Sequence, residues 1–188
     1  MQSRSDDDGG ADMNVGRWAD RKFEFTLPIE RFPVVLERLR GAPARVEEKL
    51  LALPEAIRTR RDGDKWSIQE HAGHLIDCDE LDTQRLDDFL ARAATLRAWD
   101  GTNRKTFDAN YNARPVAEIV RKFREDRERF VERLDRWKEE DLSVTAMHPR
   151  LQQPMRVIDM AQFVADHDDH HLAMMTELAN KFAARVGA

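Results

Sequence analysis

The sequence lacks the features that define several large classes of protein. It has one cysteine, Cys78, so it can form no internal disulfide, as is typical of proteins from a reducing compartment. No apolar run approaches the roughly 18 residues that a membrane-spanning helix needs. Residues 1–16 also lack the apolar segment of an export signal. We therefore expect a cytoplasmic protein without membrane association.

An excess of positive charge is missing as well, and glycine and proline are few. Lys and Arg number 31 against 36 Asp and Glu, so the net charge is -5, and we expect no nucleic-acid partner. With 41% hydrophobic and 36% charged residues, 8 Gly and 7 Pro, the composition favours a helical globular protein over a disordered one. The length suits one domain, expected over residues 20–188 after a flexible tail at 1–19.

Apolar side chains recur at the three- and four-residue spacing of helices in four stretches. The first stretch should begin with Pro28 in its first turn, and Gly41 and Pro43 should break or kink it. The second stretch follows Ser67, which with Glu70 forms a capping-box pattern. The pattern thus gives each of these two helices a defined start.

The remaining helices are expected from Pro115 to before residue 141 and over 157 to about 184, with a loop or short hairpin at 143–156. Residues 96–114 have no clean period and are long for a connection within one domain. The sequence therefore predicts an all-α fold, a four-helix bundle with one long crossover between its second and third helices.

Three of the six histidines lie close together in the fourth predicted helix. His167 and His171 fall at the centre of its apolar stripe, and His170 falls at the margin. The i, i+4 spacing lets both imidazoles reach one ion at roughly 2.0 to 2.1 Å. Without an ion, each buried ring would need another hydrogen-bond partner, since an unpaired polar group costs about 1 to 3 kcal/mol. A metal-binding pair is favoured, and a hydrogen-bonded core pair is the alternative.

The residues alone leave the third ligand open. His71 lies nearer the middle of the apolar arc of the second helix, while His74 lies at its edge beside Cys78. Cys78 is a less favoured ligand, because a lone cysteine in a helix is more often a small buried hydrophobic residue. His148 precedes a proline and has no partner at metal-ligand spacing, so we treat it as a loop residue.

Arg127 falls at the centre of the apolar stripe of the third helix, where an unpaired charge is costly. The favoured interpretation is a buried ion pair with Asp79 or Asp82 of the second helix. The alternative is an anchor for a substrate carboxylate. Trp99 and Tyr111, in the crossover, are candidates for the mouth of a site or for hydrophobic cover.

The motifs "WSIQEHAGHLIDCDELDTQRL" and "HDDHHLAMM" together resemble the DinB/YfiT-like superfamily of metal-dependent hydrolases and thiol-dependent S-transferases. The resemblance covers about residues 28–184. It implies an up-down-down-up bundle in which residues 96–114 cross between parallel second and third helices. It also implies a metal site at one end of the bundle, with ligands His74, His167 and His171.

Three neutral imidazoles leave at least one coordination position open, as in catalytic sites, with Zn²⁺ the first choice and Ni²⁺ compatible. Such an ion would lower the pKa of a bound water or thiol, which would then attack a small-molecule substrate. The resemblance adds a low-molecular-weight thiol, such as bacillithiol or mycothiol, as cosubstrate. The competing hypothesis is a non-catalytic bundle whose metal supports structure or sensing, including a homodimer joined along helix faces.

Overall fold

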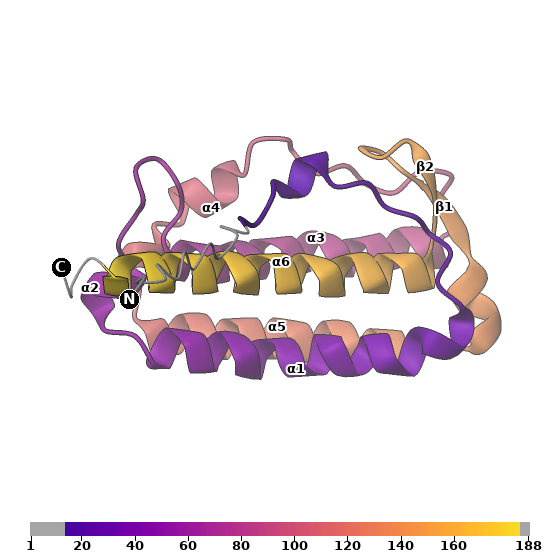
Figure 1. Cartoon of the computed structure of the whole chain (residues 1–188). Helices are drawn as coiled ribbons and strands as arrows, with labels where there is room; N and C mark the ends of the chain where they lie inside the picture. Colours follow the sequence, from indigo (N-terminus) through magenta and orange to yellow (C-terminus); the bar gives the residue numbers. More distant parts are fainter. Residues whose placement is uncertain (1–13, 185–188) are drawn as a thin grey trace, which may run out of the picture.

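Four long helices lie along one another in the computed structural model, which describes residues 14–184 (Figure 1). They are α1 (Phe32–Leu51), α3 (Ile68–Leu90), α5 (Val116–Asp135) and α6 (Val157–Ala184). Among the described residues, no helix combines the length and the apolar character that crossing a bilayer requires. Of the tail expected at 1–19, residues 1–13 lie outside the described residues, and a short 3-10 helix, η1, covers Trp18–Asp20.

The helices have the predicted up-down-down-up order. In Figure 1, α1 and α6 run in one direction and α3 and α5 in the other. Each of α1 and α3 packs against both α5 and α6, so α1 and α3 lie diagonally opposite. Because α3 and α5 are parallel, the chain between them must return along the whole bundle. That return holds α4 (Arg104–Asp108) and the 3-10 helix η3 (Tyr111–Ala113), which confirms the predicted crossover.

Local sequence patterns predicted the start of one helix correctly and that of another incorrectly. The capping box of α3 is present: the Glu70 N–H donates to Ser67 Oγ at 3.1 Å, and the Ser67 N–H donates to Glu70 Oε2 at 2.8 Å. The expected start of the first helix at Pro28 is wrong. Pro28 precedes a 3-10 turn, η2 (Ile29–Arg31), and Pro33 occupies the first turn of α1 instead.

The break expected at Gly41 and Pro43 is also wrong, because α1 runs unbroken through both residues. Pro43 removes one backbone donor, but its ring and the neighbouring Ala42 and Val46 are buried against the rest of the bundle. Tertiary packing therefore outweighs the local cost of proline at this position. After α1, a short helix, α2 (Glu55–Arg58), leads towards α3.

A small hairpin joins α5 to α6. After the 3-10 helix η4 (Glu139–Ser143), β1 (Thr145–His148) pairs antiparallel with β2 (Gln153–Arg156), and His148 lies opposite Gln153. The crossover joins the hairpin through two backbone bonds: the Leu96 N–H donates to Met147 O at 3.0 Å, and the Met147 N–H donates to Ala94 O at 2.9 Å. The segment expected as a loop or hairpin is thus a hairpin.

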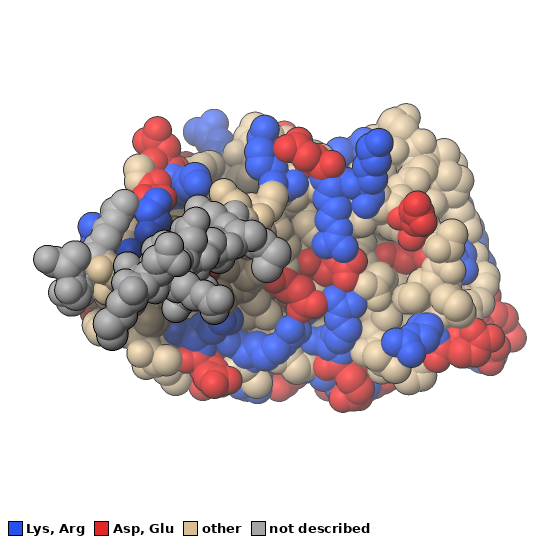
Figure 2. Space-filling view, viewed as in Figure 1, with Lys and Arg blue, Asp and Glu red and all other residues tan. Residues whose placement is uncertain are grey.

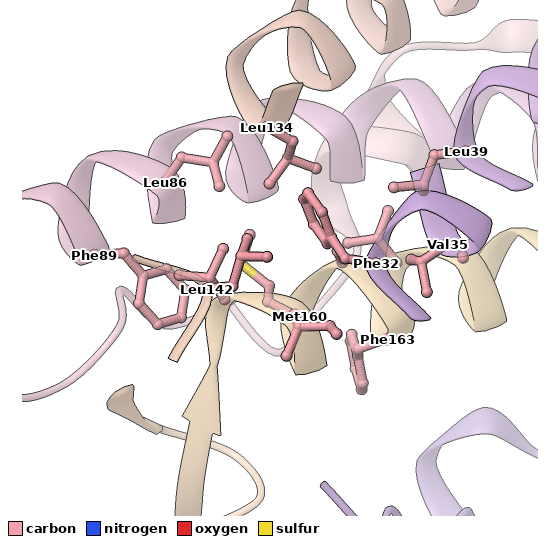
Figure 3. Packing of buried hydrophobic residues seen from close by; sticks show 14 of the residues in the cluster. Phe32, Val35, Leu39, Leu86, Phe89, Leu134, Leu142, Met160 and Phe163 are labelled. Atoms are coloured by element: carbon pink, nitrogen blue, oxygen red, sulfur yellow. The ribbon is translucent and has the colours of Figure 1, made fainter. Parts of the chain in front are cut away.

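The apolar core has two parts, one on each side of a layer of buried polar residues. Figure 3 shows the part nearer the hairpin, where Phe32, Leu86, Leu134 and Met160 from four different helices point towards one another. The second part surrounds Leu75, Phe123, Met175 and Phe182. Asp79, Asp82, Arg127 and Asp168 are buried at positions between the two parts on α3, α5 and α6, and His171 follows on α6. His71 and His74 are buried among the α3 residues of the second part.

Candidate metal centre

Three of the predicted ligands converge. His74 on α3 and His167 and His171 on α6 each offer a ring nitrogen, and these nitrogens all lie within 4.8 Å of one another. His167 Nε2 is 3.0 Å from His171 Nε2. His74 and His171 are 7% and 5% exposed, and His167 is half-buried, so the cluster opens towards solvent on the His167 side. His74 lies in the second turn of α3, near the end of the bundle where that helix begins.

The crossover orients the His74 ring. Thr106 Oγ1, on α4, donates to Asp77 Oδ2 at 2.9 Å and lies 3.2 Å from His74 Nδ1. Because the Thr106 hydroxyl donates its proton to the carboxylate, its oxygen must accept in the hydrogen bond with the imidazole. The geometry therefore assigns the imidazole proton to His74 Nδ1. Tyr111 donates from its hydroxyl to the other oxygen of Asp77, at 2.9 Å. The lone pair of the ring is therefore on His74 Nε2, the nitrogen that a metal ion would use, and Cys78 Sγ lies 3.3 Å from it.

A fourth histidine orients His171. His71 Nδ1 is 2.8 Å from His171 Nδ1, while His171 Nε2 faces His167. A lone pair on His171 Nε2 requires the proton on its Nδ1, which then donates to His71 Nδ1. His71 is thus brought into the cluster behind His171, while His74 is the α3 histidine that joins the group of three. His71 Nε2 is buried and has no hydrogen-bond partner among the described residues.

Two tryptophans cover the imidazoles. Trp66 lies 4.6 Å from the His74 ring and 5.6 Å from the His71 ring, between centroids. Trp18 lies 4.9 Å from the His167 ring and 5.5 Å from the His170 ring. Neither tryptophan was predicted from the sequence to cover the histidines. A W-S pair before a helix was part of the motif, but nothing in the local pattern shows that the Trp66 ring folds back over the histidines.

Burial keeps the rings neutral. It lowers the pKa of His71 to about 4 and that of His74 to about 3, with smaller contributions from neighbouring histidines. The pKa values of His167 and His171 are held well below the usual value by the same cause. Neutral imidazole is the form that binds a metal, so at neutral pH all four rings are in the protonation state that coordination requires.

Cys78 lies beside the cluster without joining it. Its Sγ is 3.3 Å from His74 Nε2 and is not part of the group of mutually close ligand atoms. Burial, followed by the charges of Asp82 and Asp79, raises the pKa of the Cys78 thiol well above its usual value. The protonated thiol is a weak hydrogen-bond donor, whereas a metal ligand is a thiolate.

Arg127 is fully buried in an ion-pair network. Its guanidinium donates to Asp79 at 2.7 Å and to Asp168 at 2.9 Å, and all three side chains are at most 2% exposed. The expected partner Asp79 is therefore present. Asp168 of α6 takes the second place, and Asp82 pairs with Arg85 instead, at 3.1 Å. Because its donors are committed to two carboxylates, we assign Arg127 a structural role.

The carboxylates next to the histidines in the sequence have other partners. Glu70 caps α3 and pairs with Arg61, and Asp166 and Asp169 pair with Arg38 of α1 at 2.8 and 2.5 Å. Figure 2 shows basic and acidic side chains side by side across this face of the molecule. His148, expected in a loop without a metal partner, lies at the end of β1 and is 2% exposed. Trp99 is 41% exposed, whereas Tyr111 is buried.

Comparison with known proteins assigns the chain to a family. The sequence matches the DinB superfamily over residues 38–175. The chain belongs to the DinB superfamily. The matched range contains both histidine motifs and the crossover, so it includes every element that builds the cluster of this DinB-superfamily member. No functionally curated protein matches the sequence significantly.

Among solved structures, YfiT from Bacillus subtilis is similar to this chain. The TM-score is 0.76, with 17% identity over 87% of this chain and 94% of YfiT. YfiT is described as a probable metal-dependent hydrolase with an unusual four-helix bundle topology. At this identity the similarity concerns the fold, and it matches the up-down-down-up order found here.

Proposed function

We propose that His74, His167 and His171 bind a divalent metal ion, with Zn²⁺ the first choice and Ni²⁺ compatible. The observation that carries the proposal is the convergence of three neutral imidazole nitrogens within 4.8 Å. Thr106 and His71 already hold the opposite ring nitrogens of His74 and His171, as outer partners do for metal-binding histidines. The donor set therefore fits the ion, since imidazole is a preferred ligand of zinc and nickel.

We further propose that this member of the DinB superfamily is a metal-dependent enzyme, a thiol-dependent S-transferase or a hydrolase acting on a small molecule. A divalent ion held by three neutral ligands would lower the pKa of a bound water or thiol towards neutrality and would so supply a nucleophile. Around it, Trp66 and Trp18 exclude water from the imidazoles, and the half-buried His167 marks the side from which a substrate or a low-molecular-weight thiol enters.

The second candidate is a metal-binding bundle without catalytic activity. The buried network of Arg127, Asp79 and Asp168 favours this second candidate, because its ion pairs join α5 to α3 and α6 beside the histidines. A metal ion bound at the histidines would likewise stabilise the fold. The two candidates share the metal site and differ in turnover.

Metal analysis and an activity assay test the proposal together. Zinc content after purification should be close to one ion per chain in the wild type and in His170→Ala, and should be lost in His74→Ala, His167→Ala and His171→Ala. Equal zinc content in all four variants would contradict the ligand assignment. Circular dichroism should show that each variant retains its helices.

Zinc-loaded protein incubated with a panel of thiols and a chromogenic electrophile such as chlorodinitrobenzene separates the two candidates. Turnover that His74→Ala loses while it remains folded supports the enzyme. Bound zinc with no turnover across the panel, with or without thiol, supports the non-catalytic bundle.

A further inference from the structure

A second buried polar group lies at the hairpin, beside the first part of the core. His148, at the end of β1, is 2% exposed, and its Nδ1 accepts a hydrogen bond from the Leu151 N–H at 3.2 Å. The ring proton must therefore be on Nε2. This N–H is buried and finds no acceptor among the described residues. Such a donor is costly unless a further group accepts from it.

Two arginines lie near this donor. Arg85 of α3 is 4% exposed and donates to Arg97 O at 3.3 Å. The Arg85 guanidinium therefore lies near the place where the crossover forms backbone hydrogen bonds with Met147 of β1. Arg150 occupies the turn of the hairpin, two residues after His148. The charges of Arg85 and Arg150 help to lower the pKa of His148 to about 4, after burial as the main cause.

The charge of this group is not balanced. Asp82 pairs with Arg85 at 3.1 Å, whereas Arg150 is exposed and has no carboxylate within 4.0 Å in the described part of the chain. Burial and the nearby Arg85 lower the pKa of Arg150, as expected for a cation that faces another cation. Two arginines and one aspartate leave one positive charge, and a neutral N–H donor beside it. A monoanion complements this arrangement better than a dianion does.

An aromatic path connects this cluster with the three histidines. The His148 ring is 5.6 Å from Phe163, Phe163 is 5.1 Å from Trp18, and Trp18 is 4.9 Å from His167, between ring centroids. Phe163 also lies one helical turn before His167 on α6. This row of aromatic rings lies between two polar ends, so a ligand bound along it would contact the rings with an apolar segment between its reacting group and a charged group.

We propose that His148, Arg85 and Arg150 form a carboxylate subsite for the substrate of the three-histidine centre. The carboxylate accepts from His148 Nε2 and is held by the charge of Arg150, while Phe163 and Trp18 contact the apolar segment that leads to the histidines. The proposal rests on the proposed function, because it places the reacting end of the substrate at the metal. It narrows the substrate class to small carboxylic acids, or thiols that carry a carboxylate.

Calorimetric titration of the zinc-loaded full-length protein tests this subsite. The probes are mercaptocarboxylates of increasing chain length, each compared with the mercaptoamide of the same length. We expect at least one carboxylate to bind about tenfold more tightly than its amide, a difference typical of a charge-assisted hydrogen bond. Arg150→Gln should abolish the difference. Arg121→Gln, an exposed arginine on the far helix α5 that is paired with Glu125, should preserve it.

Equal affinity for acid and amide at every length, or a preference that survives in Arg150→Gln, would overturn the subsite while leaving the metal centre intact. If no thiol binds at all, the proposed function fails, and a second measurement still decides the subsite. In metal-free protein labelled with ¹⁵N, hexanoate should shift the imidazole resonance that disappears in His148→Gln, and hexanamide should not. No shift with hexanoate, or a larger shift with inorganic phosphate, would contradict a carboxylate site.

Discussion

At the scale of single residues, the neighbours of each histidine decide what its ring can do. His74 and His171 have one nitrogen engaged by a partner and the other directed into the cluster. His148 has one nitrogen engaged, and the other is buried without an acceptor among residues 14–184. His71 accepts from a histidine of the cluster and is not a member of it. Four buried imidazoles thus receive three different roles from hydrogen bonds alone.

A substitution of His71 tests its role as an outer partner. His71→Leu removes the acceptor of His171 Nδ1, so the ring loses its fixed tautomer and orientation. We expect zinc affinity to fall roughly 10- to 100-fold, as is usual when the outer partner of a metal-binding histidine is removed. His71→Asn, whose amide oxygen can occupy the place of Nδ1, should lose less. Competition with a zinc-binding dye measures both affinities.

The alternative that His71 is itself a ligand predicts a different result. Both His71 variants would then lose as much affinity as His74→Ala, and His71→Asn would bring no rescue. His170→Ala serves as the matched control, because this half-buried histidine contacts Trp18 and belongs to neither hydrogen-bond pair.

Residue patterns predicted one half of the cluster and left the other half open for a physical reason. The spacing of His167 and His171 is local, so helical geometry alone puts both rings on one face. The choice between His71 and His74 depends on Thr106, which lies 32 residues after His74 and reaches it only through the crossover. The two partners of Arg127 differed in the same way. Asp79 was predicted because it lies on the inward arc of the second helix, whereas Asp168 of α6 was not predicted.

At the scale of elements, the crossover is part of the candidate site as well as a connection. It supplies Thr106 and Tyr111, which both donate to Asp77, and Thr106 Oγ1 also accepts from the His74 ring. It can do so only because Gly73 lets it approach α3 closely. A Cβ at Gly73 would lie 2.1 Å from the ring of Tyr111. A glycine inside a helix thus has a packing reason here.

Replacement of Gly73 should therefore destabilise the protein despite the better helix propensity of alanine. For Gly73→Ala we expect the free energy of unfolding to fall by about 1 to 3 kcal/mol, since the Tyr111 ring and the crossover must move to relieve the overlap. Chemical denaturation by urea measures this change.

The same substitution elsewhere in the bundle provides the control. Gly41→Ala, also within a helix but with nothing within 4 Å of the new Cβ, should instead raise the free energy of unfolding by roughly 0.4 to 1 kcal/mol. A gain in stability at Gly73 would mean that the crossover does not pack on α3 as described.

The elements also show where local patterns fail. The capping box of α3 was predictable because both partners lie within four residues of each other. The supposed break at Gly41 and Pro43 was not, because the contacts that hold α1 straight through them come from other helices. The order up-down-down-up came from the family resemblance, since periodicity gives the helices and not their directions.

At the scale of the whole molecule, the buried polar side chains couple stability to pH. Burial holds the pKa of His71, His74 and His148 at about 3 to 4, whereas an unfolded histidine titrates near 6.5. Between these values the unfolded chain binds more protons than the folded one, so each such histidine destabilises the fold as the pH decreases. Asp79 acts in the opposite direction, because burial raises its pKa to about 7.

His148 allows one of these contributions to be isolated, since it lies outside the three-histidine cluster, and burial followed by the charges of Arg85 and Arg150 lowers its pKa. Between pH 7 and pH 5, with a chelator present, the wild type should lose about 1 to 2 kcal/mol more of its free energy of unfolding than His148→Gln does. The reason is that glutamine gains no proton on unfolding. Urea denaturation of both proteins over this pH range measures the difference. Parallel stability curves would mean that His148 already takes up its proton in the folded state, which requires an acceptor or water at Nε2.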